Sequence, residues 1–320
     1  MNENVKAVGE NKRMVRKQSW GAMVAHDFSV NKSLYLLVLP VMAFYFIFHY
    51  LPMYGAIISF ENFKPQLGIF GSPWVGLKHF KDFLSGNYFG SLLFNTLRIS
   101  FSSLIFSFPA PIILALLINE LKCHRFAKIV QNITYMPYFI SMVVICGLIT
   151  NFTLDTGVVN YILGFFGFAP KSLLNYPQYF VPIYVISDIW QSIGWNSIIY
   201  LAALSAVDPS LYESAVLDGA NRLKQTIHIT LPSISATIVT MLLLRIGNIL
   251  NVGYEKILLL YNDSTMSVAD IISTYVYKKG LIDLSWSFSS AVGLFNSTIN
   301  LIFLIGANRI SKKLADISLW

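Results

Sequence analysis

Charged side chains are scarce in this sequence. Of its 320 residues, only 12% are Asp, Glu, Lys or Arg, whereas 55% are hydrophobic, and the mean hydropathy is +0.59. A soluble domain carries about 25% charged residues. The composition therefore excludes an ordinary soluble protein and predicts a chain with several membrane spans. The net charge of +7 is modest and is unevenly divided between loops. Membrane topology explains it better than nucleic-acid binding does.

Patterns that carry enzymatic or metal chemistry are also lacking. The two cysteines, Cys123 and Cys146, have no metal-ligand spacing, and the five histidines are scattered. No Gly-x-x-x-x-Gly-Lys-Ser/Thr phosphate loop, His-Glu-x-x-His, Cys-x-x-Cys or Gly-x-Ser-x-Gly occurs in the sequence. We therefore predict that the chain is not an enzyme, binds no metal and no cofactor, and uses Cys146 for packing.

Long apolar runs dominate what is present. About 20 apolar residues cross a bilayer, and six runs are long enough: 34–60, 92–118, 133–153, 179–206, 233–251 and 288–310. Pro137 interrupts the start of the third run, and Pro109 and Pro111 lie in the second. The predicted fold is an all-α integral membrane protein with a basic cytoplasmic tail, 1–33, and a six-helix domain, 34–320.

The distribution of Lys and Arg sets the predicted orientation. With the N-terminus inside, the inner segments hold fourteen of the 23 basic residues and the outer loops hold seven, Lys256 among them. Arg98 and Arg245 lie within or at the edge of spans. Because basic residues gather on the cytoplasmic side, both termini are predicted to be cytoplasmic.

One polar inner loop, 208–232, carries the signals of a short helix. Asp208 can accept hydrogen bonds from the first turn, and Pro209 suits the first helical position. Gly219 either ends this helix or allows another backbone to approach closely. Pro232 is expected in the first turn of the next helix. An amphipathic helix placed between two spans suggests that another protein docks there.

The same loop contains a spaced pattern that resembles a known family. It reads Glu-Ala-Ala, three residues, Gly, nine residues, Ile-x-Leu-Pro, with serine at the second position. This pattern resembles the cytoplasmic loop of permease subunits in binding-protein-dependent ABC importers. Leu223 and Thr226 depart from it, because bulkier aromatic residues are common there. The residues that carry the resemblance, and that it marks for coupling to an ATPase, are Glu213, Ser214, Ala215, Asp218, Gly219, Ala220, Ile229, Leu231 and Pro232.

Further segments extend the resemblance to nearly the whole chain. Residues 51–55, 72–77, 108–111 and 318–320 are similar to the carbohydrate branch related to the maltose permeases, and within it to importers of oligosaccharides and polysaccharides of the alginate type. The resemblance implies the type I importer permease fold, with a cytoplasmic coupling helix from Pro209 to about Gly219. It also implies a bacterial inner-membrane location among lipids.

The resemblance implies several partners. A second homologous permease would complete the translocation path, two ATP-binding subunits would hold ATP and Mg, and an extracytoplasmic solute-binding protein would deliver a carbohydrate. Glu213 is then the candidate contact to an ATPase. The alternatives are an ABC permease for another solute, such as a polyol or glycerol phosphate, an ion-coupled secondary transporter, and a membrane-bound enzyme of glycan assembly.

Polar and aromatic residues inside the spans are candidates for the substrate path. Ionisable groups are costly in a bilayer, by roughly 2.5–3.5 kcal/mol on insertion scales, so their presence suggests a function. Aromatic faces suit the C–H surface of a sugar ring, and amides suit its hydroxyls. Asp188 and Arg245 are alternatively expected to pair and fix helix packing, and the tryptophans to face core or lipid. The candidates are Asp188, Trp190, Trp195, Asn196, Asn248, Asn251 and Tyr254.

Overall fold

The computed structural model describes residues 27–320, which divide between two compact units, one ending at Ala56 and the other spanning Ile57–Trp320. The basic tail predicted for residues 1–33 lies mostly outside the described residues. The first unit holds α2 (Lys32–Tyr45), the π-helical turn η1 (Phe46–Tyr50) and α3 (Leu51–Met53), which together belong to an apolar run long enough to cross a membrane. The 3-10 helix η2 (Tyr54–Phe60) leads into the second unit.

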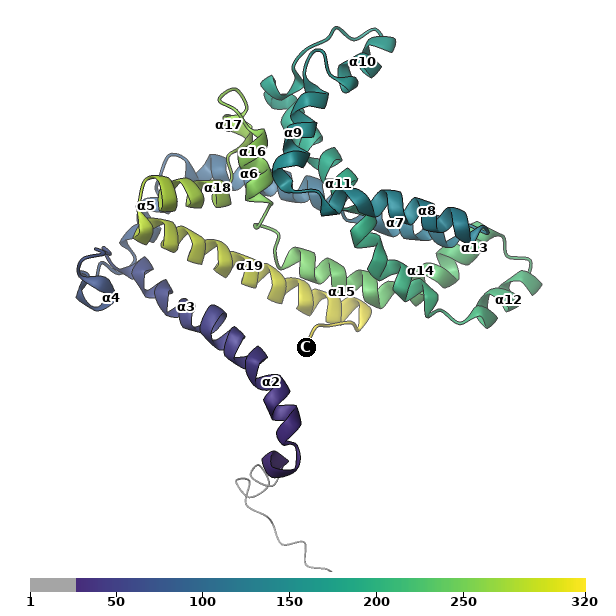
Figure 1. Ribbon diagram of the computed structural model, residues 1–320, viewed down its shortest axis with the longest axis horizontal. Coiled ribbons are helices and arrows are strands. Elements are labelled where there is room, and N and C mark those ends of the chain that lie inside the picture. Colours follow the sequence, from purple (N-terminus) through teal and green to yellow (C-terminus); the bar gives the residue numbers. More distant parts are fainter. Residues whose placement is uncertain (1–26) are drawn as a thin grey trace, which may run out of the picture. The chain divides into compact units, whose positions relative to one another are not determined.

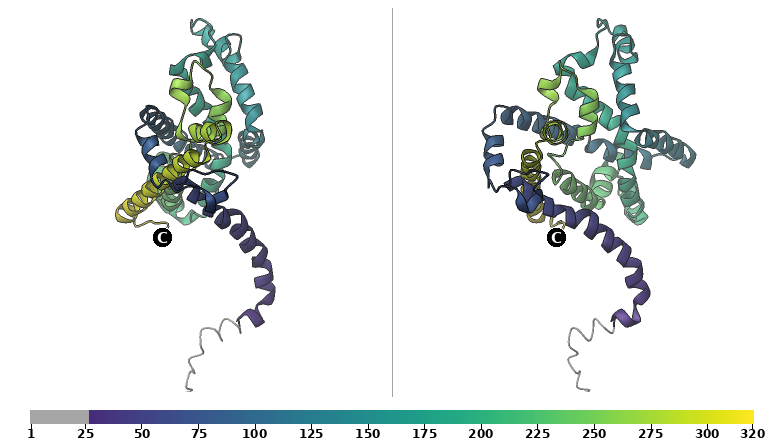
Figure 2. Two further views of the ribbon diagram at one scale, coloured as in Figure 1. Left: turned by 90° about the vertical axis from the view of Figure 1, so that its left-hand side faces the viewer. Right: turned by 60° about the vertical axis from the view of Figure 1, so that its left-hand side comes forward.

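The second unit is helical, and within it the described residues show one isolated β-bridge, between Glu61 and Trp74. Figure 1 and Figure 2 show its helices from three sides, with the teal segment that holds α9 and α10 extending away from the rest. The elements up to α11 are α4 (Gly68–Gly71), α5 (Lys78–Leu84), α6 (Phe89–Phe106), α7 (Pro109–Asn119), α8 (His124–Tyr135), η3 (Met136–Phe139), α9 (Met142–Thr153), α10 (Val158–Phe165), η4 (Leu173–Asn175) and α11 (Pro177–Ser205).

A short helix and a bent helical run follow α11. The remaining elements are α12 (Pro209–Leu217), α13 (Arg222–Gln225), η5 (Thr226–Thr230), α14 (Leu231–Ser233), α15 (Ser235–Ile246), α16 (Tyr254–Leu260), α17 (Met266–Ala269), α18 (Ile272–Tyr277), η6 (Lys278–Ile282) and α19 (Trp286–Ala315). Pro232 lies in the first turn of α14, as expected. The run from Arg222 to Ile246 bends by 62° where α14 meets α15.

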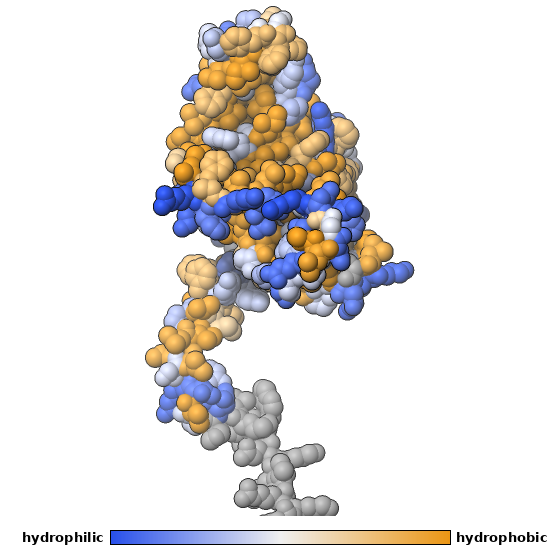
Figure 3. All heavy atoms as spheres, turned by 90° about the vertical axis from the view of Figure 1, so that its right-hand side faces the viewer, coloured by the Kyte–Doolittle hydropathy of each residue, from blue (hydrophilic) through white to orange (hydrophobic). Residues whose placement is uncertain are grey.

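Four described helical runs are long and apolar enough to cross a membrane, and the bent run makes a fifth. α11 is long enough, with 29 residues, but it is not among these runs because polar residues such as Asp188, Gln191 and Asn196 lower its hydropathy. Figure 3 shows a broad hydrophobic surface bounded below by a band of hydrophilic side chains. This surface is what a membrane protein presents to lipid.

The predicted break in the third span is confirmed. Met136–Phe139 forms a 3-10 turn with Pro137 as its second residue. Ile140 and Ser141 are extended before α9 begins. The fifth span is predicted wrongly: α15 ends at Ile246 instead of continuing helically to residue 251. Gly247 and Gly253 bracket the irregular segment that replaces the helix, which we call the linker 247–253.

The linker 247–253 is held by side chains from two other helices. Ser100 of α6 donates to the carbonyl oxygen of Ile249, and Asn300 of α19 accepts from the N–H of Leu250 at 3.0 Å. Asn296 of α19 donates to the side chain of Asn251 at 2.7 Å. Irregular backbone at membrane depth is tolerated where other groups satisfy it. These bonds explain why the chain can leave the helix here.

The core of the second unit lies around α11. Phe180 and Tyr184 pack there with Ile99 of α6, Ile145 of α9 and Ile257 of α16. Cys146 belongs to the same cluster, is 2% exposed and is a free thiol, in line with its predicted packing role.

Gly194 lets α11 and α8 approach closely. A Cβ placed on Gly194 would collide with the carbonyl oxygen of Thr134 and would lie 2.8 Å from the backbone nitrogen of Tyr135. Small residues allow membrane helices to pack backbone against backbone. The contact fixes the position of the neighbouring residue, Trp195, whose ring stacks on that of Tyr138 with centroids 4.7 Å apart.

Candidate functional site

The loop helix α12 begins as its sequence predicts. The Asp208 side chain accepts from the N–H of Ser210 at 2.9 Å, and Pro209 occupies the first helical turn. Hydrogen bonding from the Ser210 backbone lowers the pKa of the Asp208 carboxyl, because it favours the charged form. A second cap follows at α13, where Asn221 accepts from the N–H of Lys224 at 2.9 Å.

The end of α12 also follows the prediction. Gly219 has a φ of +75°, and its N–H bonds to the carbonyl of Val216 at 3.0 Å. The N–H of Ala220 bonds to the carbonyl of Ala215 at 2.9 Å. These two bonds form a Schellman motif, in which glycine adopts the left-handed conformation at little cost. No atom of the described residues lies within 4 Å of a Cβ built on Gly219, so within this chain its role is to end the helix.

α12 offers an accessible surface at the end of the unit, beyond α13 and α14 (Figure 1). None of its residues is buried, and the side chains of Val216 and Leu217 are 62% and 89% exposed. Glu213 and Ser214 are exposed as well. A solvent-exposed loop that displays large apolar side chains next to a carboxylate has the character of a docking surface.

The segment that follows α12 is tied both to α12 and to α11. Tyr212 of α12 and Thr230 of η5 share a hydrogen bond of 3.0 Å between their hydroxyls. Leu231 packs against a buried cluster that includes Tyr200 and Leu204 of α11. Ala215, Ala220 and Ile229 are half-buried, and Asp218 and Pro232 are exposed.

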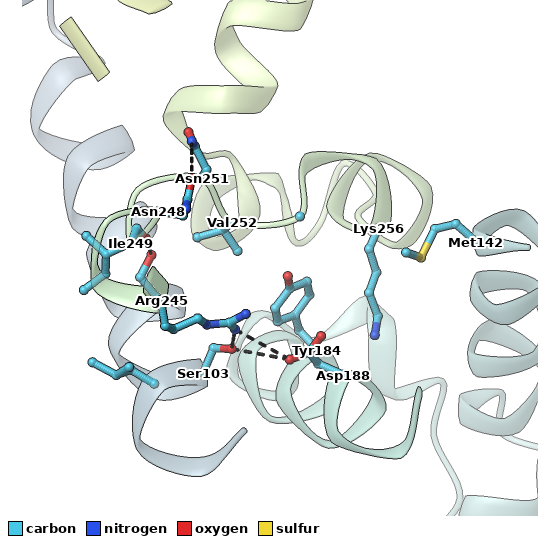
Figure 4. A pocket seen from close by; sticks show the side chains of 13 residues that line it. Ser103, Met142, Tyr184, Asp188, Arg245, Asn248, Ile249, Asn251, Val252 and Lys256 are labelled. Carbon is cyan, nitrogen blue, oxygen red and sulfur yellow. Dashed lines mark hydrogen bonds and ion pairs between the residues drawn. The ribbon is translucent and has the colours of Figure 1, made fainter. Parts of the chain in front are cut away.

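A cavity of about 290 Å³ lies between α6, α11, the linker 247–253 and α16 (Figure 4). We call it the upper cavity. Hydroxyl, amide and charged groups line it together with Tyr184 and Met142. Its polar side chains are those of Ser100, Ser103, Tyr184, Asp188, Arg245, Asn248, Asn251 and Lys256.

Asp188 and Arg245 pair through a serine. Arg245 Nη2 donates to Ser103 Oγ at 2.7 Å, and the Ser103 hydroxyl lies 3.4 Å from Asp188 Oδ2. The direct distance from Arg245 Nη2 to Asp188 Oδ2 is 4.0 Å. The Arg245 side chain is 49% exposed, so this contact combines the pairing expected from the sequence with access to the cavity (Figure 4).

A second cavity, of about 720 Å³, adjoins the first, and we call it the lower cavity. Asp188, Arg245 and Asn248 line both. Trp195 and Asn196 line the lower cavity only. The ion pair therefore stands where the two cavities meet.

The structure gathers five of the seven predicted path residues. Asp188, Trp195, Asn196, Asn248 and Asn251 line one or both of these cavities. Trp190 and Tyr254 line neither; they are 42% and 47% exposed elsewhere on the unit. Asn248, Asn251 and Tyr254 do not lie on one helix, because the first two lie in the linker 247–253 and Tyr254 begins α16.

Lys256, predicted to lie in an outer loop, lies instead in α16. It is 2% exposed, and its ammonium lies 5.4 Å from the centroid of the Tyr184 ring within the upper cavity. The sequence gives a faint signal of this: Ile257, Leu258 and Leu259 follow it directly, which suits a buried helix more than a loop.

The chain matches known proteins over most of its length. Residues 83–316 match the family described as "Binding-protein-dependent transport system inner membrane component". The chain is 45% identical over 287 residues to the polygalacturonan/rhamnogalacturonan transport system permease protein YteP of Bacillus subtilis (strain 168), a match that covers 89% of each protein.

Two solved structures are similar as well. One is the crystal structure of a bacterial ABC transporter involved in the import of the acidic polysaccharide alginate; the other is a bacterial alginate ABC transporter in complex with an alginate pentasaccharide-bound periplasmic protein. In each, the matching chain is 40% identical with a TM-score of 0.84, and the match covers 92% of this chain and 99% of that chain.

Proposed function

We propose a function that proceeds from one premise: this chain belongs to the family of binding-protein-dependent transport system inner membrane components. It is a permease subunit of the ABC transporter class, and its fold is that of an ABC importer permease. We infer that it forms part of the path by which oligosaccharides or polysaccharide fragments enter a bacterial cell. One similar permease transports polygalacturonan or rhamnogalacturonan, and another belongs to an alginate importer.

The observation that carries the proposal is the position of α12. This exposed helix directly connects α11 and the bent run ending in α15, and those two helices supply Asp188 and Arg245 to the cavities. Movement imposed on α12 by a partner therefore reaches the cavity walls through the backbone. That arrangement suits a coupling helix, with Glu213 and Leu217 contacting an ATPase.

The proposed topology has six spans and cytoplasmic termini. It takes α11 as a span although polar residues lower its hydropathy, because about 29 residues of helix reach about 44 Å. Its polar residues then face the cavities instead of lipid, as Asp188 and Asn196 do. The proposed location is the bacterial inner membrane.

The proposed assembly contains a second homologous permease, two ATP-binding subunits and an extracytoplasmic solute-binding protein. A complex with a periplasmic protein is known for the similar alginate transporter. ATP and Mg would bind to the ATP-binding subunits, with no cofactor on this chain. We propose that the five predicted residues that line the cavities contact the sugar on its path. Trp190 and Tyr254 would join the path where the second permease completes it.

The proposal is tested by uptake into proteoliposomes that contain the complete assembly. We expect ATP-dependent uptake of labelled uronic-acid or neutral oligosaccharides that requires the binding protein. Glycerol phosphate and a polyol, offered in parallel, represent the alternative solutes. Uptake of either of these without any sugar uptake would contradict the proposed substrate class, and uptake driven by an ion gradient without ATP would contradict the transporter class.

Replacing Asn248 with leucine should weaken sugar uptake. Asn248 lines both cavities; its side-chain amide nitrogen donates to the Leu244 carbonyl at 3.2 Å, and its oxygen accepts from Asn251 Nδ2 at 3.4 Å, a long bond that leaves a second lone pair of this oxygen for a sugar hydroxyl. Loss of one hydrogen bond to sugar, worth about 1 kcal/mol, should raise the KM for uptake about fivefold. The control is Asn151→Leu, the same change at an exposed position outside both cavities. An unchanged KM in Asn248→Leu would remove Asn248 from the path.

A further inference from the structure

The upper cavity contains a buried cation without a matching carboxylate. Lys256 is 2% exposed, and its ammonium donates to Gln191 Oε1 at 3.4 Å. Among the ion pairs of residues 27–320, none includes Lys256. Lys278, another lysine that is partly buried beside a tyrosine, has its own carboxylate: its ammonium lies 3.1 Å from Asp270 and 4.9 Å from the Tyr261 ring.

The charges that line the upper cavity do not balance. Arg245 and Lys256 contribute two positive charges, and Asp188 contributes the one carboxylate. That carboxylate already faces Arg245, directly at 4.0 Å and through Ser103. A charge without a partner is costly in a low-dielectric interior. An anion that enters the cavity would offset this cost, so the cavity is prepared for a negatively charged group.

The geometry points to a carboxylate subsite formed by Lys256 and Arg245 for a uronic-acid unit of the transported oligosaccharide, an inference that rests on the proposed import of sugars. Lys256 supplies a compact charge on a flexible stem, and Arg245 supplies a planar fork that matches a carboxylate. The incoming carboxylate would take the place of Asp188 beside Arg245. Figure 4 shows Arg245 and Lys256 reaching into the same cavity from opposite sides of Tyr184.

The rest of the cavity suits a sugar ring that carries such a group. Tyr184 and Val252 offer apolar surface, and Asn248 and Asn251 offer amides for hydroxyls. The cavity volume of about 290 Å³ lies near the lower end for ligand pockets, about 300–1,000 Å³. One ring in the upper cavity, with the chain continuing into the lower cavity past Asp188, would fit an extended oligosaccharide.

The test compares Lys256→Met with Lys256→Arg in the reconstituted importer, with trigalacturonate and its fully methylated ester as probes. Removing the charge should raise the KM for the free acid about tenfold or more, since a hydrogen bond to a charged group is lost. Ester uptake should stay unchanged, and Lys256→Arg should retain acid uptake. If the binding protein rejects the ester, the role of the charge is shown by acid uptake alone, which Lys256→Arg should retain and Lys256→Met should lose.

A matched control and a second variant keep the outcome decisive. Lys171 also lies over tyrosine rings, at 4.6 Å from that of Tyr179, but lines neither cavity, so Lys171→Met should leave the KM for the acid unchanged. Asp188→Asn removes the competing carboxylate and should lower that KM. If Lys256→Met does not assemble, Asp188→Asn still tests the carboxylate subsite.

Several results would overturn the subsite. They are equal loss of acid and ester uptake in Lys256→Met, unchanged acid uptake in that variant, and a higher KM for the acid in Asp188→Asn. In each case the wild-type importer would still transport sugars, so the proposed function would stand. Absence of sugar uptake by the wild type would instead contradict the proposed function.

Discussion

Replacing Gly194 with alanine is expected to prevent this chain from folding stably. The added methyl group would meet the Thr134 carbonyl oxygen, with the Tyr135 nitrogen 2.8 Å away, and both are backbone atoms that cannot rotate aside. Overpacking of a well-packed core costs about 1–3 kcal/mol, and we expect the upper end here. The change should lower the melting temperature of the purified chain and reduce the amount recovered from membranes.

Gly293→Ala provides the matched control. Gly293 lies inside α19, and no atom of the described chain lies within 4 Å of its added Cβ. Alanine is favoured over glycine in a helix by roughly 0.5–1 kcal/mol, so the control should keep or raise the melting temperature. Equal melting temperatures for Gly194→Ala and the wild type would show that α8 and α11 can separate without cost.

The second large effect is expected at the surface of α12. The double change Glu213→Ala and Leu217→Asp removes the carboxylate proposed to contact an ATPase and puts a charge where an apolar side chain is 89% exposed. Residues central to an interface cost about 2 kcal/mol or more when changed, which is about thirtyfold in affinity. The ATPase subunits should no longer copurify with the permease, and ATP-dependent uptake should be lost.

Because α12 is exposed, this double change should leave the fold of the permease intact. Its melting temperature should match that of the wild type. Leu314→Asp makes a similar substitution near the end of α19, where the side chain is 80% exposed, and should retain the ATPase subunits. Full copurification and uptake in the double variant would rule out α12 as the coupling helix.

Local features of the fold could be predicted from sequence because their causes are local. The caps of α12 lie within five residues of the backbone groups they satisfy, so Asp208, Pro209 and Gly219 locate its ends. The break near Pro137 is local in the same sense, since the missing N–H belongs to the residue itself. The loop pattern also led to the family, which the match over residues 83–316 establishes.

The linker 247–253 could not be predicted, because what stabilises it is distant in the chain. Ile249, Leu250 and Val252 continue the apolar pattern of α15, whereas the side chains that satisfy the irregular backbone, Ser100 and Asn300, come from α6 and α19. The burial of Lys256 depends on the same break, because the turn of the chain at 247–253 brings α16 back beside Tyr184. The predicted loop at Lys256 is therefore wrong, because this residue lies in α16.

The position of α12 between α11 and the bent run has a mechanical consequence. α12 joins the two arms of this helical hairpin, and Asp188 on α11 faces Arg245 on α15. In the proposed coupling, a movement of α12 is expected to change the distance between α11 and α15, because the 62° bend where α14 meets α15 redirects the second arm. The distance between Arg245 and Asp188, 4.0 Å in this structure, is the one we expect to change with that movement.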